Sequence, residues 1–388
     1  MRPIAGRLTG KIVAALRGVR PGIRAMLAAA QTLLVDRTVP PRRSPYIQNV
    51  STDSATIVWV GDEPERGVVE YGEGPNLGST AAEELASRRH AVTLRGLAPG
   101  SAYHYRVDGG ATGRFRTAPE SGVAFTFAVI GDTGNGGKHQ MAVAGLLERV
   151  KPDLILHTGD VVYPSGEDKH YDKRFFAPYR GVIGSVPLFP VLGNHDVQED
   201  DGAAFLKNFH PPRNNPRGTA RYYSFDWSDA HFVALDSELY YEDTGGDAGE
   251  QRLWLEEDLS ATRKLWRFAF LHRPLYSSSR HGGDQKIRAD LAPLLSRHGV
   301  HLVFSGHDHV YERTLPMDGV TYLVTGGGGK RLYKARNKGW TAASASAHHA
   351  TFVRVTRESL NLEAVKPDGT ILDCLDIRAD TRGTPSLP

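Results

Sequence analysis

The spacing of apolar residues divides the chain into three regions. From Ile4 to Leu34 apolar residues return every three or four positions, and arginine and lysine fall on the opposite side. This period predicts a basic amphipathic helix. After Pro40-Pro41 short alternating runs are separated by turn residues, which predicts brief strands at 54–60, 67–71, 90–94, 103–107 and 113–116.

Beyond Ala118-Pro119 apolar strands alternate with helical segments, which indicates βαβ crossovers. The pattern predicts helices near 138–150, 249–262 and 284–298, and strands at 125–130, 154–157, 188–192, 232–236, 268–272, 302–305, 321–324, 351–355, 360–365 and 371–377. We therefore expect a helical segment over 1–39, a small β-sandwich over 40–119, an α/β domain of mixed sheets flanked by helices over 120–380, and a tail over 381–388.

The N-terminal helix has three interpretations. It packs on its own domains, lies on a membrane surface, or forms an export signal with residues 25–35 as the apolar part. The signal fits less well because charges continue to Arg24 and the apolar run contains Gln31. No stretch approaches the ~20 apolar residues of a membrane span. The location stays open, and the interpretations of the basic helix favour a peripheral membrane or extracytoplasmic one without a transmembrane segment.

Composition removes several classes of function. Lys and Arg number 47 against 44 Asp and Glu, and a formal charge of +3 over 388 residues does not indicate a nucleic-acid-binding face. The single cysteine, Cys374, excludes an internal disulfide framework and a cysteine-rich zinc module. Any bound metal therefore needs histidine, carboxylate and other oxygen ligands.

Such ligands follow five of the predicted strands. The motifs are Gly131-Asp132-Thr133-Gly134, Gly159-Asp160-Val161-Val162-Tyr163, Gly193-Asn194-His195-Asp196, Leu271-His272-Arg273-Pro274 and Gly306-His307-Asp308-His309. Loops at the carboxyl ends of strands are where α/β sheets place function. Two cations about 3.5–4 Å apart need a bridging anion, and Asp160 is the natural bridge. Glycines beside the ligands allow sharp turns and close approach, and the ligand set suits iron, zinc or manganese better than calcium.

Two family resemblances follow from these residues. Trp59 and the run Leu97–Tyr103 resemble a fibronectin type III domain, with Tyr103 placed like its tyrosine corner and both aromatic residues in the core. The five motifs, with Asp-x-Gly in the first and Tyr163 three residues after Asp160, resemble the purple acid phosphatases within the calcineurin-like metallophosphoesterases. Larger members of that group carry a fibronectin-like module ahead of the catalytic domain.

The second resemblance implies two metal sites. One is formed by Asp132, Asp160, Tyr163 and His309, where a tyrosinate favours Fe(III). The other is formed by Asp160, Asn194, His272 and His307, and it holds Fe, Zn or Mn. The resemblance further implies that His195 contacts the substrate phosphate, that Asp196 orients the His195 ring, and that His281 lies on the substrate side.

These roles imply hydrolysis of phosphate monoesters of small molecules by a metal-bound hydroxide, with His195 and His281 stabilising charge and protonating the leaving group. Phosphodiester or nucleotide hydrolysis on the same metals stays open, because the ligands do not fix the leaving group. A binding or adhesion module with an inactive phosphatase domain is a weaker alternative, and no Gly-x-Ser-x-Gly elbow supports a serine hydrolase. We also expect His157 to be buried, Asp308 to point away from the metals, and His348-His349 to lie in a surface loop.

Overall fold

The computed structural model describes residues 43–108, 110–241 and 247–379, which belong to one compact unit. The helix expected over 1–39 and the tail over 381–388 lie outside the described residues. Within the described part, no helix combines the length and apolar character needed to cross a membrane.

The first five strands form an all-β sheet, as expected. They are β1 (Arg43–Gln48), β2 (Ser54–Gly72), β3 (Ser79–Arg95), β4 (Ala102–Val107) and β5 (Thr112–Arg116), in the order β1-β2-β4-β5 with β3 also paired to β2. The prediction of two separate strands at 54–60 and 67–71 was wrong. The polar residues between them do not form a turn, because β2 stays paired with β3 across two register shifts.

Both aromatic residues singled out in this sheet lie in its core. Trp59 is fully buried and its indole N–H donates to Asp108 at 2.7 Å. Tyr103 is buried, and the Ala98 backbone N–H donates to its hydroxyl at 2.9 Å. This bond ties the tyrosine hydroxyl to the turn that precedes β4.

The rest of the chain forms two mixed sheets. The six-stranded sheet has the order β18-β17-β16-β6-β7-β8, with β6 (Phe125–Ile130), β7 (Leu154–His157), β8 (Leu188–Pro190), β16 (Ala350–Val355), β17 (Ser359–Val365) and β18 (Ile371–Arg378). The seven-stranded sheet has the order β15-β13-β14-β12-β11-β10-β9, with β9 (Tyr223–Trp227), β10 (Ala230–Ala234), β11 (Trp266–Phe270), β12 (Leu302–Ser305), β13 (Tyr311–Thr314), β14 (Thr321–Thr325) and β15 (Thr341–Ala345).

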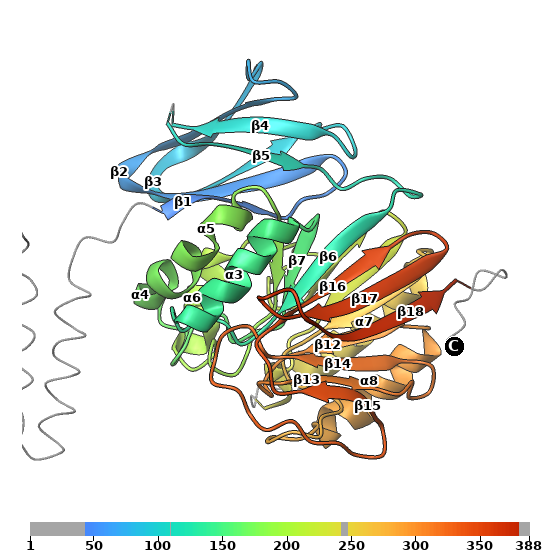
Figure 1. Cartoon of the computed structure of the whole chain (residues 1–388). Coiled ribbons are helices and arrows are strands. Elements are labelled where there is room, and N and C mark those ends of the chain that lie inside the picture. Colours follow the sequence, from blue (N-terminus) through green and yellow to red (C-terminus); the bar gives the residue numbers. More distant parts are fainter. Residues whose placement is uncertain (1–42, 109, 242–246, 380–388) are drawn as a thin grey trace, which may run out of the picture. The chain divides into compact units, whose positions relative to one another are not determined.

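Alternating side chains place the two sheets face to face between helices. Phe127 and Leu156 share one buried cluster with Phe268 and Phe304 of the other sheet, because successive residues of a strand point to opposite faces. The intervening residues face helices. Those of β6 and β7 meet α3 (Lys138–Val150) and α5 (Ala177–Ile183), whereas those of β11 and β12 meet α7 (Asp247–Ala261) and α8 (Gln285–Arg297). Figure 1 shows α3, α5 and neighbouring short helices in green beside β6 and β7.

Some elements were not predicted. They include β1, β9, β13 and β15, the helices α4 (Asp168–Tyr171), α5 and α6 (Ala203–Asn208), and the π-helical turn Asp172–Phe176. The strands after which Asn194 and His272 occur end at Pro190 and Phe270, earlier than expected, because the chain leaves the sheet before it presents these side chains.

Candidate metal centre

The five motifs come together at the carboxyl ends of parallel strands from both sheets. Strands β6, β7 and β8 are parallel neighbours, and they precede Asp132, Asp160 and Asn194. Strands β11 and β12 are parallel neighbours in the other sheet, and they precede His272 and His307. Since the two sheets face one another, ligands separated by more than 170 residues in the chain meet at one edge of the sandwich.

The backbone turns sharply at three of these positions. Asp132, Asp160 and His307 have φ of 57°, 53° and 67°, in the left-handed region that costs a non-glycine residue on the order of 1–3 kcal/mol. Gly306 fulfils the expectation of close approach, because a Cβ there would lie 2.5 Å from Asp132 Oδ2. Strain of this kind persists where surrounding structure enforces it, and it gathers at functional sites.

Asp132, Tyr163 and His309 form one group of buried donor atoms. The Tyr163 hydroxyl lies 3.2 Å from Asp132 Oδ1 and 3.2 Å from His309 Nε2, and His309 Nε2 lies 3.4 Å from Asp132 Oδ1. His309 Nδ1 donates to the Arg331 carbonyl at 2.8 Å. Its Nε2 lone pair therefore faces the other two oxygens when the ring is neutral.

His272, Asn194 and His307 form the second group. His272 Nε2 lies 3.1 Å from Asn194 Oδ1 and 3.2 Å from His307 Nδ1. The other His272 nitrogen, Nδ1, donates to the Thr158 carbonyl at 2.8 Å, which fixes the tautomer with its Nε2 lone pair directed at the group.

Asp160 lies between the two groups. Its Oδ1 is 3.4 Å from His272 Nε2. Its negative charge and a hydrogen bond also raise the pKa of the Tyr163 hydroxyl. One ligand atom each from Asp132, Asp160 and His272 lie within 4.8 Å of one another. The structure thus gives Asp160 the central place that a bridging carboxylate needs.

The chemistry of these atoms fits bound cations. Two imidazole lone pairs and two carboxylates converge in a buried space, where acceptors facing acceptors are costly without positive charge between them. Burial and then the nearby His272 lower the pKa of His307 to about 2, so this imidazole is neutral and able to bind metal. Burial, Asp160 and Asp132 hold the pKa of Tyr163 well above its ordinary value, so a phenolate there requires a cation.

His195 lies at the rim of the two groups. Its backbone N–H donates to Asp160 Oδ1 at 2.9 Å, and its ring packs on Tyr163 with centroids 4.6 Å apart. The ring Nδ1 donates to the Pro164 carbonyl. The Nε2 edge lies 3.9 Å from Asp160 Oδ2, on the side of the candidate metal centre.

Asp196 does not orient the His195 ring, so that expectation was wrong. Its buried carboxylate accepts the backbone N–H groups of Val161, Val162 and Gly193 at 2.9–3.2 Å. These bonds favour the ionised form, whereas burial and then Asp160 raise the pKa of Asp196 to about 7. Asp196 instead fixes the loop that follows Asp160 to the loop that carries Asn194.

His281 reaches the rim from the loop before α8. Its ring centroid is 4.5 Å from that of His307, and its Nε2 lies 3.5 Å from the Tyr333 hydroxyl. Asp308 points away from the metal ligands, as expected, and accepts the His281 backbone N–H at 2.9 Å and the Ser277 hydroxyl at 2.5 Å. Asp308 therefore holds the loop that carries His281.

Three further histidines, His157, His348 and His349, lie outside the five motifs. His157 is buried as expected, and it pairs with the Thr133 hydroxyl at 2.9 Å. The surface-loop prediction for His348-His349 was wrong for His349, which is fully buried 3.1 Å from the Thr325 hydroxyl. His348 is partly buried and stacks on His139 with centroids 4.2 Å apart. The glycine-rich run before them suggested a loop, but this segment leads into β16.

Sequence reasoning missed two residues beside the centre. Tyr333 stacks on His309 with centroids 4.2 Å apart, and the Lys330 ammonium lies 3.7 Å from the centre of the Tyr163 ring. Both belong to a stretch after β14 that contains five cations and no acid between 330 and 338. That local charge was visible in the sequence, but its place beside the motifs was not.

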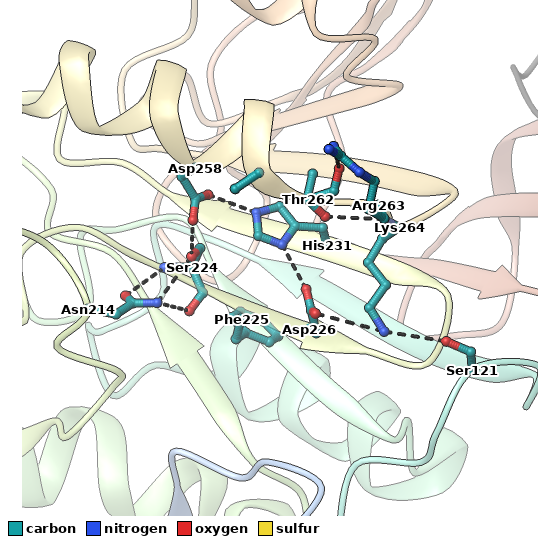
Figure 2. A pocket seen from close by; sticks show the side chains of 11 residues that line it. Ser121, Asn214, Ser224, Phe225, Asp226, His231, Asp258, Thr262, Arg263 and Lys264 are labelled. Carbon is teal, nitrogen blue, oxygen red and sulfur yellow. Dashed lines mark hydrogen bonds and ion pairs between the residues drawn. The ribbon is translucent and has the colours of Figure 1, made fainter.

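None of these residues lines a polar cavity elsewhere in the catalytic part. It has a volume of about 690 Å³ and is lined by His231, Asp226, Asp258 and Lys264 among others. His231 is held between the carboxylates of Asp226 at 2.7 Å and Asp258 at 2.8 Å (Figure 2). Because each ring nitrogen donates to a carboxylate, this histidine is a structural cation and offers no free base.

Comparisons with known proteins agree with the geometry. The calcineurin-like phosphoesterase family matches residues 125–311. Purple acid phosphatase 18 of Arabidopsis thaliana is 29% identical over 311 residues, covering 72% of this chain and 69% of that protein. Acid phosphatase type 7 of Mus musculus is 30% identical over 305 residues, covering 68% of each.

A solved structure supports the fold. Purple acid phosphatase PPD1 from yellow lupin (Lupinus luteus) seeds superposes with a TM-score of 0.74 at 20% identity, covering 88% of this chain and 76% of that one. Together with the relatives at about 30% identity, this places the chain in the purple acid phosphatase family of metal-dependent phosphoesterases.

Proposed function

We propose that the chain hydrolyses phosphate monoesters with two metal ions. The observation that carries the proposal is the convergence of two groups of oxygen and imidazole ligand atoms on the Asp160 carboxylate. This carboxylate lies 3.4 Å from His272 Nε2 and raises the pKa of the Tyr163 hydroxyl. One group is Asp132, Tyr163 and His309, and the other is Asn194, His272 and His307. A tyrosine in the first group favours Fe(III), and the second suits Fe, Zn or Mn.

Two cations bound there would lower the pKa of a coordinated water to near neutral and would neutralise charge on the phosphoryl oxygens. The residues of the chain supply the remaining functions. Asp132 and Asp160 balance the positive charge, and their rigid, strained backbone keeps the ligands preorganised. His195, with Nδ1 held by the Pro164 carbonyl, presents its Nε2 edge to a phosphoryl oxygen.

His281 is placed to donate a proton to the departing oxygen. It lies on the side of His307, in a cavity of about 430 Å³ that also contains Arg273 and Lys286. Burial, above all, lowers the pKa of His281, so its proton is released more readily. The cavity gives the alcohol part of the substrate a place outside the ligand groups.

The five-stranded sheet precedes the catalytic domain in the chain. The buried Trp59 and the bond from Ala98 to the Tyr103 hydroxyl support a fibronectin type III-like module at 40–119 ahead of the catalytic domain at 120–380. The Tyr105 hydroxyl donates to the Gly184 carbonyl at 2.7 Å, so this sheet also braces the helix that ends beside it.

The test is metal content together with hydrolysis of matched esters. We expect two equivalents of metal and faster hydrolysis of phenyl phosphate than of diphenyl phosphate. His195→Ala should retain the metals and slow the monoester. A metal-loaded protein that prefers the diester would support phosphodiesterase activity instead, and a protein that binds no metal would refute the proposal.

A further inference from the structure

The rim of the candidate metal centre carries a concentration of positive charge. The 330–338 loop contains five cations and no acid, namely Lys330, Arg331, Lys334, Arg336 and Lys338. The 273–288 segment contains four cations and one acid, Asp284. The whole chain has only three more cations than acids, so this excess is local and does not reflect general composition.

The 330–338 loop is fixed against the ligands. The Lys330 backbone N–H donates to the Asp132 carbonyl at 3.1 Å, and the Tyr333 N–H donates to the His309 carbonyl at 3.0 Å. The Ser279 hydroxyl donates to the Lys334 carbonyl at 3.1 Å, which joins this loop to the 273–288 segment. The two basic segments therefore form one continuous border.

Most of this charge is not neutralised. Among the described residues, Arg273 is the one cation of the two segments that has a carboxylate within ion-pair distance, Glu238 at 2.8 Å. Lys286 instead donates to the Tyr240 carbonyl at 2.5 Å, which leaves its charge uncompensated. Exposed cations are usually paired or interspersed with acids, so an unpaired group beside a site points to an anionic ligand.

The cavity between His307 and α8 limits the size of that ligand. Its volume of about 430 Å³ and its lining, which includes Arg273, His281 and Lys286, suit a small molecule. A phosphate on His195 and the metals would leave the alcohol part of the ester in this cavity, where a second anionic group meets Lys286. The lining also includes Asp284, and Arg280 of the same segment lies over the Tyr333 ring, 5.1 Å from its centre, where it adds to the positive charge of the border.

Resting on the proposed function, we propose that the preferred substrate is a small molecule with a second phosphate group beyond the one that is cleaved. The 273–288 segment binds the second phosphate, and the 330–338 loop adds to the attractive field. A monoester with a neutral alcohol has no group in the cavity for the cations of the 273–288 segment to bind.

The experiment compares propyl phosphate with propane-1,3-diyl bisphosphate, which differ only in the second phosphate. Wild-type protein should prefer the bisphosphate in kcat/KM, and the preference should shrink as salt is added. Arg280→Gln with Lys286→Gln should lower the ratio about five- to tenfold, as expected for the loss of two nearby charges. The control, Arg354→Gln with Arg357→Gln, removes two exposed cations elsewhere and should leave the ratio unchanged.

Binding of the non-hydrolysable propane-1,3-diyl bisphosphonate, followed by calorimetry, gives a readout that does not need turnover. Weaker binding by the Arg280/Lys286 variant than by the control supports the proposal even if neither ester is hydrolysed, an outcome that would refute only the proposed function. The bisphosphate proposal would be overturned if both variants showed the same kcat/KM ratio and bound the bisphosphonate equally well. The bisphosphate proposal would also be overturned if the kcat/KM ratios were equal while the protein bound heparin in a salt-sensitive way and the Arg280/Lys286 variant lost that binding. The cations would then serve a macromolecular polyanion.

Discussion

The Tyr163 phenol is buried between Asp132 and His309, at 3.2 Å from each. In the absence of positive charge its pKa is raised by burial and by two carboxylates. A phenolate at this position therefore reports directly on a strongly charged cation. Lys330, above the ring at 3.7 Å, adds positive charge but does not contact the oxygen.

We expect iron-loaded, oxidised protein to show a visible charge-transfer band that Tyr163→Phe abolishes. Tyr333→Phe is the matched control, because Tyr333 stacks on His309 while its hydroxyl faces His281, and this variant should keep the band. The measurement is the visible spectrum with iron determined on the same sample. A colourless wild type with full iron would contradict the assignment of Tyr163.

His231 should make the stability of the protein depend on pH. Burial lowers its pKa, but hydrogen bonds to Asp226 and Asp258 more than offset this and raise it to about 9. The folded pKa exceeds the unfolded value near 6.5, so the stabilisation is complete below pH 6.5 and is lost as the pH rises through about 9. Because Asp226 is half exposed, we expect about 2 kcal/mol at most.

Urea unfolding of wild type and His231→Gln at pH 6 and pH 9.5, in one fixed metal state, measures this effect. The difference in the free energy of unfolding should be largest at pH 6 and should narrow at pH 9.5. His104→Gln, on β4 and without an ion-pair partner in the described structure, should show no such trend. A constant difference across the range would show that His231 acts by packing alone.

Among the elements, the loop between β11 and α8 links the metal ligands to the proposed acid. Asp308 accepts the His281 backbone N–H, the Gly282 backbone N–H and the Ser277 hydroxyl. The loop is thereby attached to the residue between the two ligands His307 and His309. The position of His281 depends on this attachment and not on a regular element.

His281→Ala should retain both metals and slow alkyl phosphates by ~10²–10⁴-fold, while aryl phosphates, whose phenolate leaves without acid help, change little. Ser277→Ala, which removes one bond to Asp308, should shift the alkyl-to-aryl rate ratio in the same direction by a smaller factor. In the double variant the two effects should not add, because both act through His281. An unchanged ratio in His281→Ala would assign the acid role elsewhere, first to His195.

Elements with a clear period were predictable. The strands at 125–130, 154–157 and 302–305 and the helix at 138–150 agree with β6, β7, β12 and α3, because apolar runs and amphipathic spacing determine them locally. Strand β2 was split in the prediction because its middle is polar, and only pairing with β3 keeps it extended.

In the site, too, locally determined features were predictable and features that depend on distant contacts were not. The motifs around Asp132 and Asp160 were predictable because each side chain follows its strand directly. The role of Asp196 was not, since it depends on backbone donors from residues 161 and 162. The 330–338 loop was not predicted either, because its place results from hydrogen bonds to residues 132 and 309, which no local pattern encodes.

At the scale of the molecule, the candidate centre joins the two sheets. Asp132, Asp160 and Asn194 come from loops of the six-stranded sheet, and His272 and His307 come from loops of the seven-stranded sheet. Without cations, buried carboxylates and lone pairs face one another across this junction. Metal binding to the folded state should therefore stabilise the whole sandwich by linkage.

We expect metal saturation to raise the Tm of the protein above that of the chelator-treated form. At 100-fold excess over Kd the gain is about 2.7 kcal/mol per site, and two filled sites should together raise the Tm on the order of 5–10 °C for a protein of this size. Asp160→Asn removes the central negative charge, so it should lose most of the metal-induced rise and slow aryl phosphate hydrolysis by several orders of magnitude. Asp373→Asn is the control: it breaks a partly buried pair with Arg313 at 2.6 Å, between β18 and β13 and outside both ligand groups. It should lower the Tm in both metal states while leaving the rise and the turnover intact. A metal-replete Asp160→Asn protein with near-normal turnover would contradict a mechanism that needs both cations.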